Sequence, residues 1–152
     1  MQARMKNPAL VLPEAMKSLL ALGAISHKTG LPKTTLFMVY LRASQINGCS
    51  LCVGMHSREM KQAGETDDRI YSVAAWREAP WFTDAERAAL ALTETTTRLA
   101  DKEDAVPDPI WDEARKHYDD EKLSGLILAI ASINVWNRLN VAVRQPVGAW
   151  KI

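Results

Sequence analysis

The spacing of prolines, glycines and helix-capping residues divides this chain into segments whose apolar side chains recur at the period of an α-helix. Pro13 and Pro32 can each occupy the first turn of a helix, and Gly30 and Gly48 can end these two segments. Thr83-Asp-Ala-Glu86 has the pattern of a capping box, which marks a further helix start. We therefore expect helices over residues 13–30, 33–47, 49–64, 67–78, 83–99 and 109–118, and a last helix that starts after Asp119 or Asp120.

The last of these helices is apolar nearly all round, through Leu126-Ile-Leu-Ala-Ile-Ala-Ser-Ile133. Such a helix is usually central in a fold or lies in a subunit interface. Gly125 lowers the stability of this helix, so we expect it to mark the close approach of another helix. No segment is predicted to be a β-strand, and no internal repeat or second-domain linker is found. The prediction is an all-α protein in which residues 1–152 form a single helical-bundle domain of six or seven helices.

Length and composition limit the class of protein. The 152 residues are enough to bury one core, and 47% hydrophobic with 24% charged residues is typical of a soluble globular domain. A net charge of +1 gives no reason to expect nucleic acid or an anionic membrane as a partner. No apolar run approaches the roughly 18 residues of a membrane span, and the first residues lack the apolar core of a secretory signal. We expect a cytoplasmic protein, in which an isolated cysteine pair is more often catalytic, redox-sensing or metal-binding than structural.

Both cysteines and one of the three histidines lie in a single short stretch, Cys49-Ser-Leu-Cys-Val-Gly-Met-His56. In a helix, Cys49 and Cys52 are spaced i, i+3 and His56 follows one turn after Cys52, so all three share a face. Cys49 would lie in the first turn, where unpaired backbone amides and the helix dipole favour a thiolate. His56 could instead deprotonate Cys52. The helix start thus favours a thiolate on Cys49, whereas His56 favours one on Cys52. The spacing is also compatible with an intramolecular disulfide between them.

Two simpler interpretations of this stretch stay open. Free cysteines are often small buried hydrophobic residues without reactivity. The stretch could also belong to a zinc site, because it supplies three of the four ligands that a closed site needs. The fourth ligand would come from His27, His117, a carboxylate or another subunit. Outside such a site we expect His27 and His117 to be surface residues, since polar residues surround them.

Residues 44–56, Ser-Gln-Ile-Asn-Gly-Cys-Ser-Leu-Cys-Val-Gly-Met-His, resemble the signature of the alkylhydroperoxidase D-like branch of the carboxymuconolactone decarboxylase superfamily. Residues 76–94 and 134–138 resemble the second half of that family's domain, so the match covers roughly residues 31–143. The resemblance implies an all-helical fold that assembles as a homo-oligomer, either a trimer or a hexamer.

The same resemblance implies a thiol–disulfide active site that reduces a hydroperoxide substrate or passes electrons to a peroxiredoxin partner. By this resemblance Cys52 is the thiol that attacks the peroxide, Cys49 is its disulfide partner, and His56 belongs to a proton relay to Cys52. An external dithiol protein would reduce the disulfide again. Such a site needs no metal, haem or flavin cofactor.

One position departs from the family's pattern. The family commonly has a glutamate twelve residues before the first motif cysteine, where it accepts the relay's proton, but this chain has Phe37 there. Tyr40, Glu86 and Glu94 are candidates to replace that glutamate. Each also has a simpler role: Tyr40 as a half-buried aromatic, Glu86 as the capping-box partner, and Glu94 as a solvated helix residue.

The function that we expect is that of a thiol-dependent antioxidant oxidoreductase. One alternative is a lyase of the decarboxylase branch, which would bind a small carboxylated lactone and would not require the cysteine pair. The other is a non-enzymatic redox-sensing oligomer whose assembly changes when the disulfide forms. Phe37 keeps this second alternative open, because it cannot accept a proton.

Overall fold

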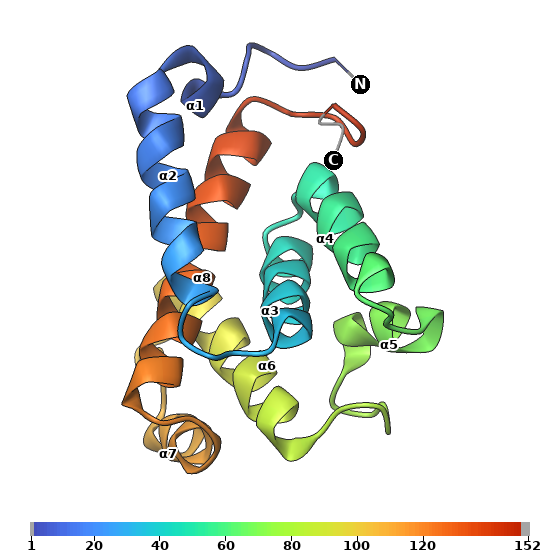
Figure 1. Cartoon of the computed structure of the whole chain (residues 1–152), viewed down its shortest axis with the longest axis vertical. Coiled ribbons are helices and arrows are strands. Elements are labelled where there is room, and N and C mark those ends of the chain that lie inside the picture. Colours follow the sequence, from blue (N-terminus) through green and yellow to red (C-terminus); the bar gives the residue numbers. More distant parts are fainter. Residues whose placement is uncertain (1, 150–152) are drawn as a thin grey trace.

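The computed structural model describes residues 2–149, apart from the side chain of Asp101, and within them the regular structure is helical throughout (Figure 1). The α-helices are α1 (Pro8–Val11), α2 (Pro13–Ser26), α3 (Lys33–Ile46), α4 (Ser50–Gln62), α5 (Asp67–Ser72), α6 (Asp84–Thr97), α7 (Asp108–His117) and α8 (Asp120–Ala142). Two 3-10 turns are present, η1 (Val73–Ala75) and η2 (Leu99–Asp101). Six of these α-helices have ten residues or more, so the predicted all-α fold is confirmed.

Helix α3 lies at the centre of the fold because it is buried on more than one face. Leu36, Val39 and Ala43 recur at helical spacing and pack with residues of α6 and α8 in one hydrophobic cluster. Met38 and Leu41 lie on another face and pack with residues of α4, α5 and η1 in a second cluster. Figure 1 shows α3 between α4 on one side and α8 on the other. Because α3 is central and only a short turn follows it, the first residues of α4 lie inside the fold.

Helix α8 packs against α2, α3 and α6 along much of the molecule (Figure 1). By length and hydropathy it could cross a membrane, which was not expected from the sequence, but 50% of the window concerned is buried inside the fold. Gly125 does mark a close approach. A Cβ at this position would lie 2.3 Å from Oγ1 of Thr29, so the close neighbour belongs to the loop after α2 and not to another helix.

Three buried asparagines, Asn134, Asn137 and Asn140, follow one another at intervals of three residues along α8, and we call them the asparagine ladder. Nδ2 of Asn47, at the end of α3, donates to Oδ1 of both Asn134 and Asn137, each at 2.9 Å. Asn137 donates in turn to Oγ of Ser44 at 3.0 Å. These hydrogen bonds satisfy polar groups that would otherwise destabilise an apolar helix interface.

The helix predicted over residues 67–78 is too long. Helix α5 ends at Ser72, and only the turn η1 follows it. Residues 76–78 form a turn, and Pro80 has no amide hydrogen that could bond to the carbonyl of Trp76. The carbonyl of Trp76 accepts a hydrogen bond from the guanidinium of Arg87 on α6 instead, at 3.1 Å. The short helix α1 was not predicted either; its N-cap is Asn7.

Glu94 is buried, and its prediction as a solvated helix residue is wrong. Its side chain is 7% exposed and lies 2.6 Å from the guanidinium groups of both Arg42 and Arg77. Nε1 of Trp76 donates a further hydrogen bond at 2.9 Å. Burial alone would raise the pKa of Glu94, but the hydrogen bonds from these three groups outweigh it and hold the pKa below its ordinary value. The network joins α3, α6 and the segment after η1.

We expect Glu94→Gln to lower the free energy of unfolding by about 3 kcal/mol at neutral pH, because it leaves the largely buried Arg42 without a counter-charge. The pKa of Glu94 is lower in the folded chain than its ordinary value of 4.5, so this stabilisation is present above that value and is lost as the pH falls through the folded-state pKa. Urea unfolding of both proteins at neutral and acidic pH measures the effect. A difference that stayed constant into the acid range would contradict it.

Candidate active site

The two cysteines lie at the start of α4 and are joined in a disulfide. Gly48, with a φ of 66°, makes the turn between α3 and α4 in a backbone conformation that favours glycine. Cys49 is the N-cap of α4 and not a residue of its first turn, and its Sγ accepts a hydrogen bond from the backbone amide of Cys52 at 3.3 Å. This sulfur therefore occupies the place of a capping side chain and stabilises the helix start.

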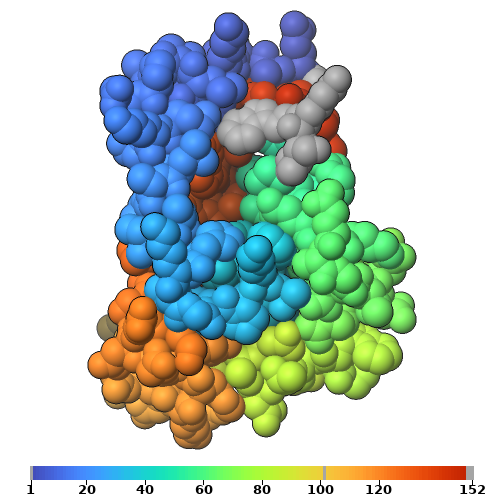
Figure 2. Space-filling view, in the orientation of Figure 1, coloured from blue at the N-terminus to red at the C-terminus, as the bar shows by residue number. Residues whose placement is uncertain are grey.

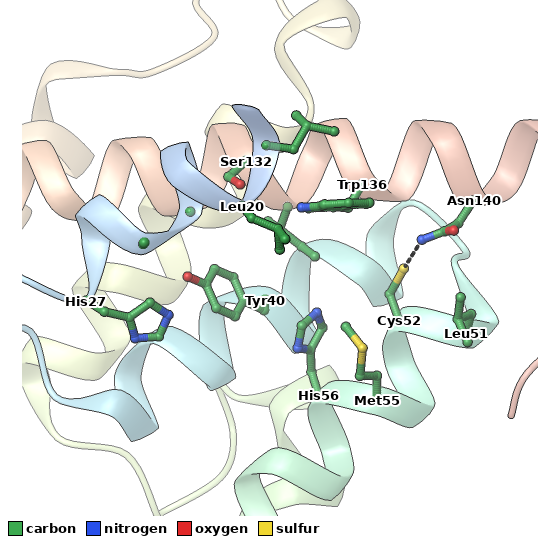
Figure 3. Close-up of a pocket in the computed structure, with 14 residues that line it drawn as sticks. Leu20, His27, Tyr40, Leu51, Cys52, Met55, His56, Ser132, Trp136 and Asn140 are labelled. Atoms are coloured by element: carbon green, nitrogen blue, oxygen red, sulfur yellow. Dashed lines mark hydrogen bonds between the residues drawn. The ribbon is translucent and has the colours of Figure 1, made fainter. Parts of the chain in front are cut away.

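Only one of the two sulfurs faces a cavity. Cys52 is 1% exposed but lines a cavity of about 420 Å³, whereas Cys49 is 2% exposed and does not line it. Nδ2 of Asn140 on α8 lies 3.4 Å from Sγ of Cys52, as the dashed line in Figure 3 marks. A small molecule that entered the cavity would therefore reach Cys52 and not Cys49.

The cavity lies between α2, α3, α4 and α8 and is mostly apolar. Figure 2 shows a hollow at this place, with α8 recessed behind α2 and α4. In Figure 3, His27 and Tyr40 lie toward one end, Cys52 and Asn140 toward the other, and His56 stands between them. The apolar lining is formed chiefly by Leu19, Leu20, Leu51, Met55, Ile133 and Trp136.

His56 is buried in the cavity wall and is held by a carboxylate. Its Nδ1 lies 2.6 Å from Oε2 of Glu59, one turn further along α4. A carboxylate can only accept a hydrogen bond, so the hydrogen lies on Nδ1, and in the neutral ring Nε2 is then an acceptor. Nε2 is fully buried and has no hydrogen-bond partner in the described part of the chain. An unpaired acceptor in a cavity wall can take a proton from a group bound there.

Tyr40 lines the cavity beside His56, with 5.1 Å between the two ring centroids, and it is more buried than the sequence suggested. Burial raises the pKa of Tyr40 to about 12, and the charge of Glu59 adds to the rise. The hydroxyl therefore keeps its proton at neutral pH and cannot be the acceptor of a relay. Glu59 can be that acceptor, because its side chain is 24% exposed and connects His56 with solvent.

Of the three candidates to replace the missing glutamate, only Tyr40 lines the cavity. Glu86 completes the capping box as predicted and also pairs with Arg69 at 2.7 Å. Phe37 is partly buried and packs against both hydrophobic clusters. Sequence reasoning missed Glu59, although its position three residues after His56 on the same helix was a usable signal.

The second histidine, His27, is exposed as predicted but also lines the cavity. Asn140 and Trp136 line the cavity from α8, more than eighty residues after Cys52 in the chain, and no sequence motif indicated them. Among the side chains that the structure describes, no three from His, Cys, Asp or Glu form a group that could hold a metal ion. The described side chains therefore do not bring together the ligands that the zinc site considered from the sequence would need.

Comparison with known proteins agrees with this architecture. Residues 13–95 match the carboxymuconolactone decarboxylase family. The uncharacterized protein YdfG of Bacillus subtilis is 37% identical over 133 residues, which are 88% of this chain and 89% of YdfG.

Two solved structures have the same fold. A protein of unknown function from Agrobacterium tumefaciens, described as a proposed antioxidant defence protein AhpD, superposes with a TM-score of 0.89 at 36% identity, over 96% of this chain and 98% of that chain. The alkylhydroperoxidase AhpD core of a peroxidase-related protein from Ralstonia eutropha superposes with a TM-score of 0.79 at 19% identity, over 92% and 74%, and supports the fold alone. The chain therefore belongs to the carboxymuconolactone decarboxylase family and has the AhpD-like fold.

Proposed function

We propose that this protein is a thiol peroxidase that reduces organic hydroperoxides through Cys49 and Cys52. The observation that carries the proposal is the combination at the cavity wall: one sulfur of a CxxC pair faces an apolar cavity beside a histidine whose buried Nε2 is unpaired. The description of the Agrobacterium relative as a proposed antioxidant defence protein agrees with it. The expectation of an organic substrate rests on the apolar cavity and not on the family match.

In the first step His56 takes the proton of the Cys52 thiol through Nε2, and the thiolate attacks the outer oxygen of the hydroperoxide. A sulfur–oxygen bond forms, the oxygen–oxygen bond breaks, and the leaving alkoxide takes the proton from His56 to become an alcohol. Cys52 is then a sulfenic acid. Glu59 stabilises the protonated imidazole and can pass its proton to solvent.

In the second step the Cys49 thiolate attacks the sulfur of the sulfenic acid, and the disulfide forms as water leaves. The N-cap position suits Cys49 to this role, because the Cys52 amide and the helix N-terminus both stabilise its thiolate. The same effects make Cys49 a good leaving group when an external dithiol attacks Cys52 from the cavity. That reductant, or a peroxiredoxin partner, supplies the two electrons of each cycle.

The test is a single-turnover experiment on fully reduced protein. One equivalent of an organic hydroperoxide is added, the free thiols are alkylated after short times, and the intact mass is measured. We expect both alkylation sites to be lost together as the Cys49–Cys52 disulfide forms. If both thiols remained open to alkylation for many minutes, the peroxidase proposal would be wrong and a redox-sensing or lyase function would gain support.

The apolar cavity predicts a preference for organic hydroperoxides over hydrogen peroxide. Gly23 lies on the α2 wall, where a Cβ would meet no atom closer than 3.6 Å, so Gly23→Leu should fold and extend into the cavity. We expect it to lower the rate with cumene hydroperoxide about tenfold relative to the rate with hydrogen peroxide. Ala21→Leu, on the same helix but outside the cavity, is the matched control. An unchanged ratio in Gly23→Leu would show that substrate does not enter by this cavity.

A decarboxylase-type lyase is the less well supported function. A small carboxylated lactone is an anion, and an arginine or lysine in the cavity would favour its binding. The residues that line the described cavity include neither arginine nor lysine. The cavity thus suits a neutral apolar molecule better than an anion.

We also propose that the protein works as a homo-oligomer, a trimer or a hexamer, in the cytoplasm. Apolar side chains that are exposed in the single chain support this proposal. Leu20 and Ile25 lie on α2, and Val135 and Val141 lie on the neighbouring α8. Light scattering on the purified protein would give the number of subunits.

A further inference from the structure

Three buried residues from distant parts of the chain form a line of hydrogen bonds that ends on the Cys52 sulfur. Nδ2 of Asn7, in the segment before α1, donates to Oδ1 of Asn140 on α8 at 2.8 Å. Nδ2 of Asn140 lies 3.4 Å from Sγ of Cys52 and points toward it in Figure 3. Asn7 is 0% exposed and Asn140 is 4% exposed, so water does not compete for these bonds.

The direction of this line is set by a backbone amide. Oδ1 of Asn7 accepts a hydrogen bond from the amide of Ala9 at 2.8 Å, as the N-cap of α1. A backbone amide can only donate, so Oδ1 of Asn7 must face it and Nδ2 must face Asn140. Asn140 then has to present its oxygen to Asn7 and its N–H to the sulfur. The orientation of the amide that contacts Cys52 is thus determined at Ala9.

We propose that Asn140 stabilises the thiolate of Cys52 and that Asn7 is the positioning residue that holds the Asn140 amide in the productive orientation. After reduction, the N–H that faces the disulfide sulfur faces a thiol or a thiolate. A hydrogen bond to the charged form favours that form. This inference deepens the proposed function, because its catalytic meaning rests on Cys52 as the attacking thiol.

The other titratable groups around this sulfur come from different elements. Cys49 caps α4, and His56 lies on α4 in contact with Glu59. Tyr40 lies on α3 and His27 follows α2, whereas α8 contributes no charged residue to the cavity. His56 can act as the base that removes the proton, and Asn140 can only stabilise the charge that results. Substitutions of His56 and of Asn140 can therefore separate the removal of the proton from the stabilisation of the thiolate.

The test uses Asn7→Asp in a Cys49→Ser background, in which Cys52 is the only thiol. The introduced carboxylate keeps an oxygen for the Ala9 amide but offers a second oxygen to Asn140, so the Asn140 amide should flip and turn its oxygen to the sulfur. We expect the pH midpoint of thiolate formation, followed by ultraviolet absorbance, to rise by about one pH unit. Asn140→Leu, which removes the N–H donor without adding a charge, should also raise it and separates the loss of the hydrogen bond from the charge of an introduced carboxylate.

Arg4→Ala is the matched control for loosening of the N-terminal segment. The Arg4 side chain also ties this segment to the end of α8, by donating to the carbonyl of Ala142 at 3.2 Å, but it takes no part in the asparagine line. The control should leave the midpoint unchanged. An unchanged midpoint in Asn140→Leu, with helical content retained, would overturn the inference whatever Asn7→Asp did. A shifted midpoint in a protein that does not react with peroxide would support it and refute the proposed function alone.

Discussion

Cys52→Ser is expected to lower the rate at which reduced protein consumes an organic hydroperoxide by at least about a thousandfold, or ~4 kcal/mol of transition-state stabilisation. Serine has no thiolate at neutral pH, and Cys49 does not line the cavity and cannot take over the attack. The loss of hydroperoxide under single-turnover conditions measures the effect directly. It does not depend on knowing the physiological reductant.

Cys49→Ser is the natural control, because Cys49 is an N-cap and serine is one of the best capping residues. This variant should still consume one equivalent of hydroperoxide, and Cys52 should accumulate as a sulfenic acid that a dimedone-type reagent can trap. The assignment of the two cysteines would be reversed if the sulfenic acid formed on Cys49 in Cys52→Ser and none formed on Cys52 in Cys49→Ser.

His56→Gln is expected to slow peroxide reduction by about 10²- to 10⁴-fold at neutral pH, because the thiol loses its general base. The deficit should shrink as the pH rises toward about 8.5, where thiols ionise without a base. Glu59→Gln should also lower the rate, since it removes the charge that orients and stabilises the imidazole and leaves the ring in place. The measurement is the single-turnover rate as a function of pH.

The chain offers a matched control for this prediction. His117 and Glu113 form a second histidine–carboxylate pair on α7, with 3.2 Å between Nε2 and Oε1, and neither residue lines the cavity. His117→Gln should therefore leave both the rate and its pH profile unchanged. A deficit in His56→Gln that was the same at all pH values would contradict the role of His56 as a base and would indicate a packing defect.

The sequence was informative wherever one local signal determines the structure. Thr83 and Asp119 cap helices as predicted, and the i, i+3 spacing placed Cys49 and Cys52 within bonding distance. The same local reasoning failed for residues 73–78, where a helix was predicted but the structure has the 3-10 turn η1 and a further turn.

Features that depend on contacts between distant segments could not be predicted. Glu94 looks like any glutamate on an amphipathic helix, and only the folded chain brings Arg42 and Trp76 to it. Asn140 and Asn7 carry no motif, and their effect on Cys52 exists only because α8 and the segment before α1 meet there. Glu59 differs, because its spacing from His56 on one helix is visible in the sequence, whereas Tyr40, Glu86 and Glu94 lie elsewhere in the chain.

The hydrogen bonds of the asparagine ladder fix the position of α8 along its own axis, which its apolar surface alone cannot do. Contacts between aliphatic side chains are non-directional, so a helix that is apolar nearly all round could slide along its neighbours with little loss of buried area. A slip of one turn, about 5.4 Å, would break the bonds from Asn47 to Asn134 and Asn137 at once. A ladder replaced by leucines could leave a well-buried helix whose axial position varied from molecule to molecule. The sulfur of Cys52 would then meet a different part of α8 in each of them.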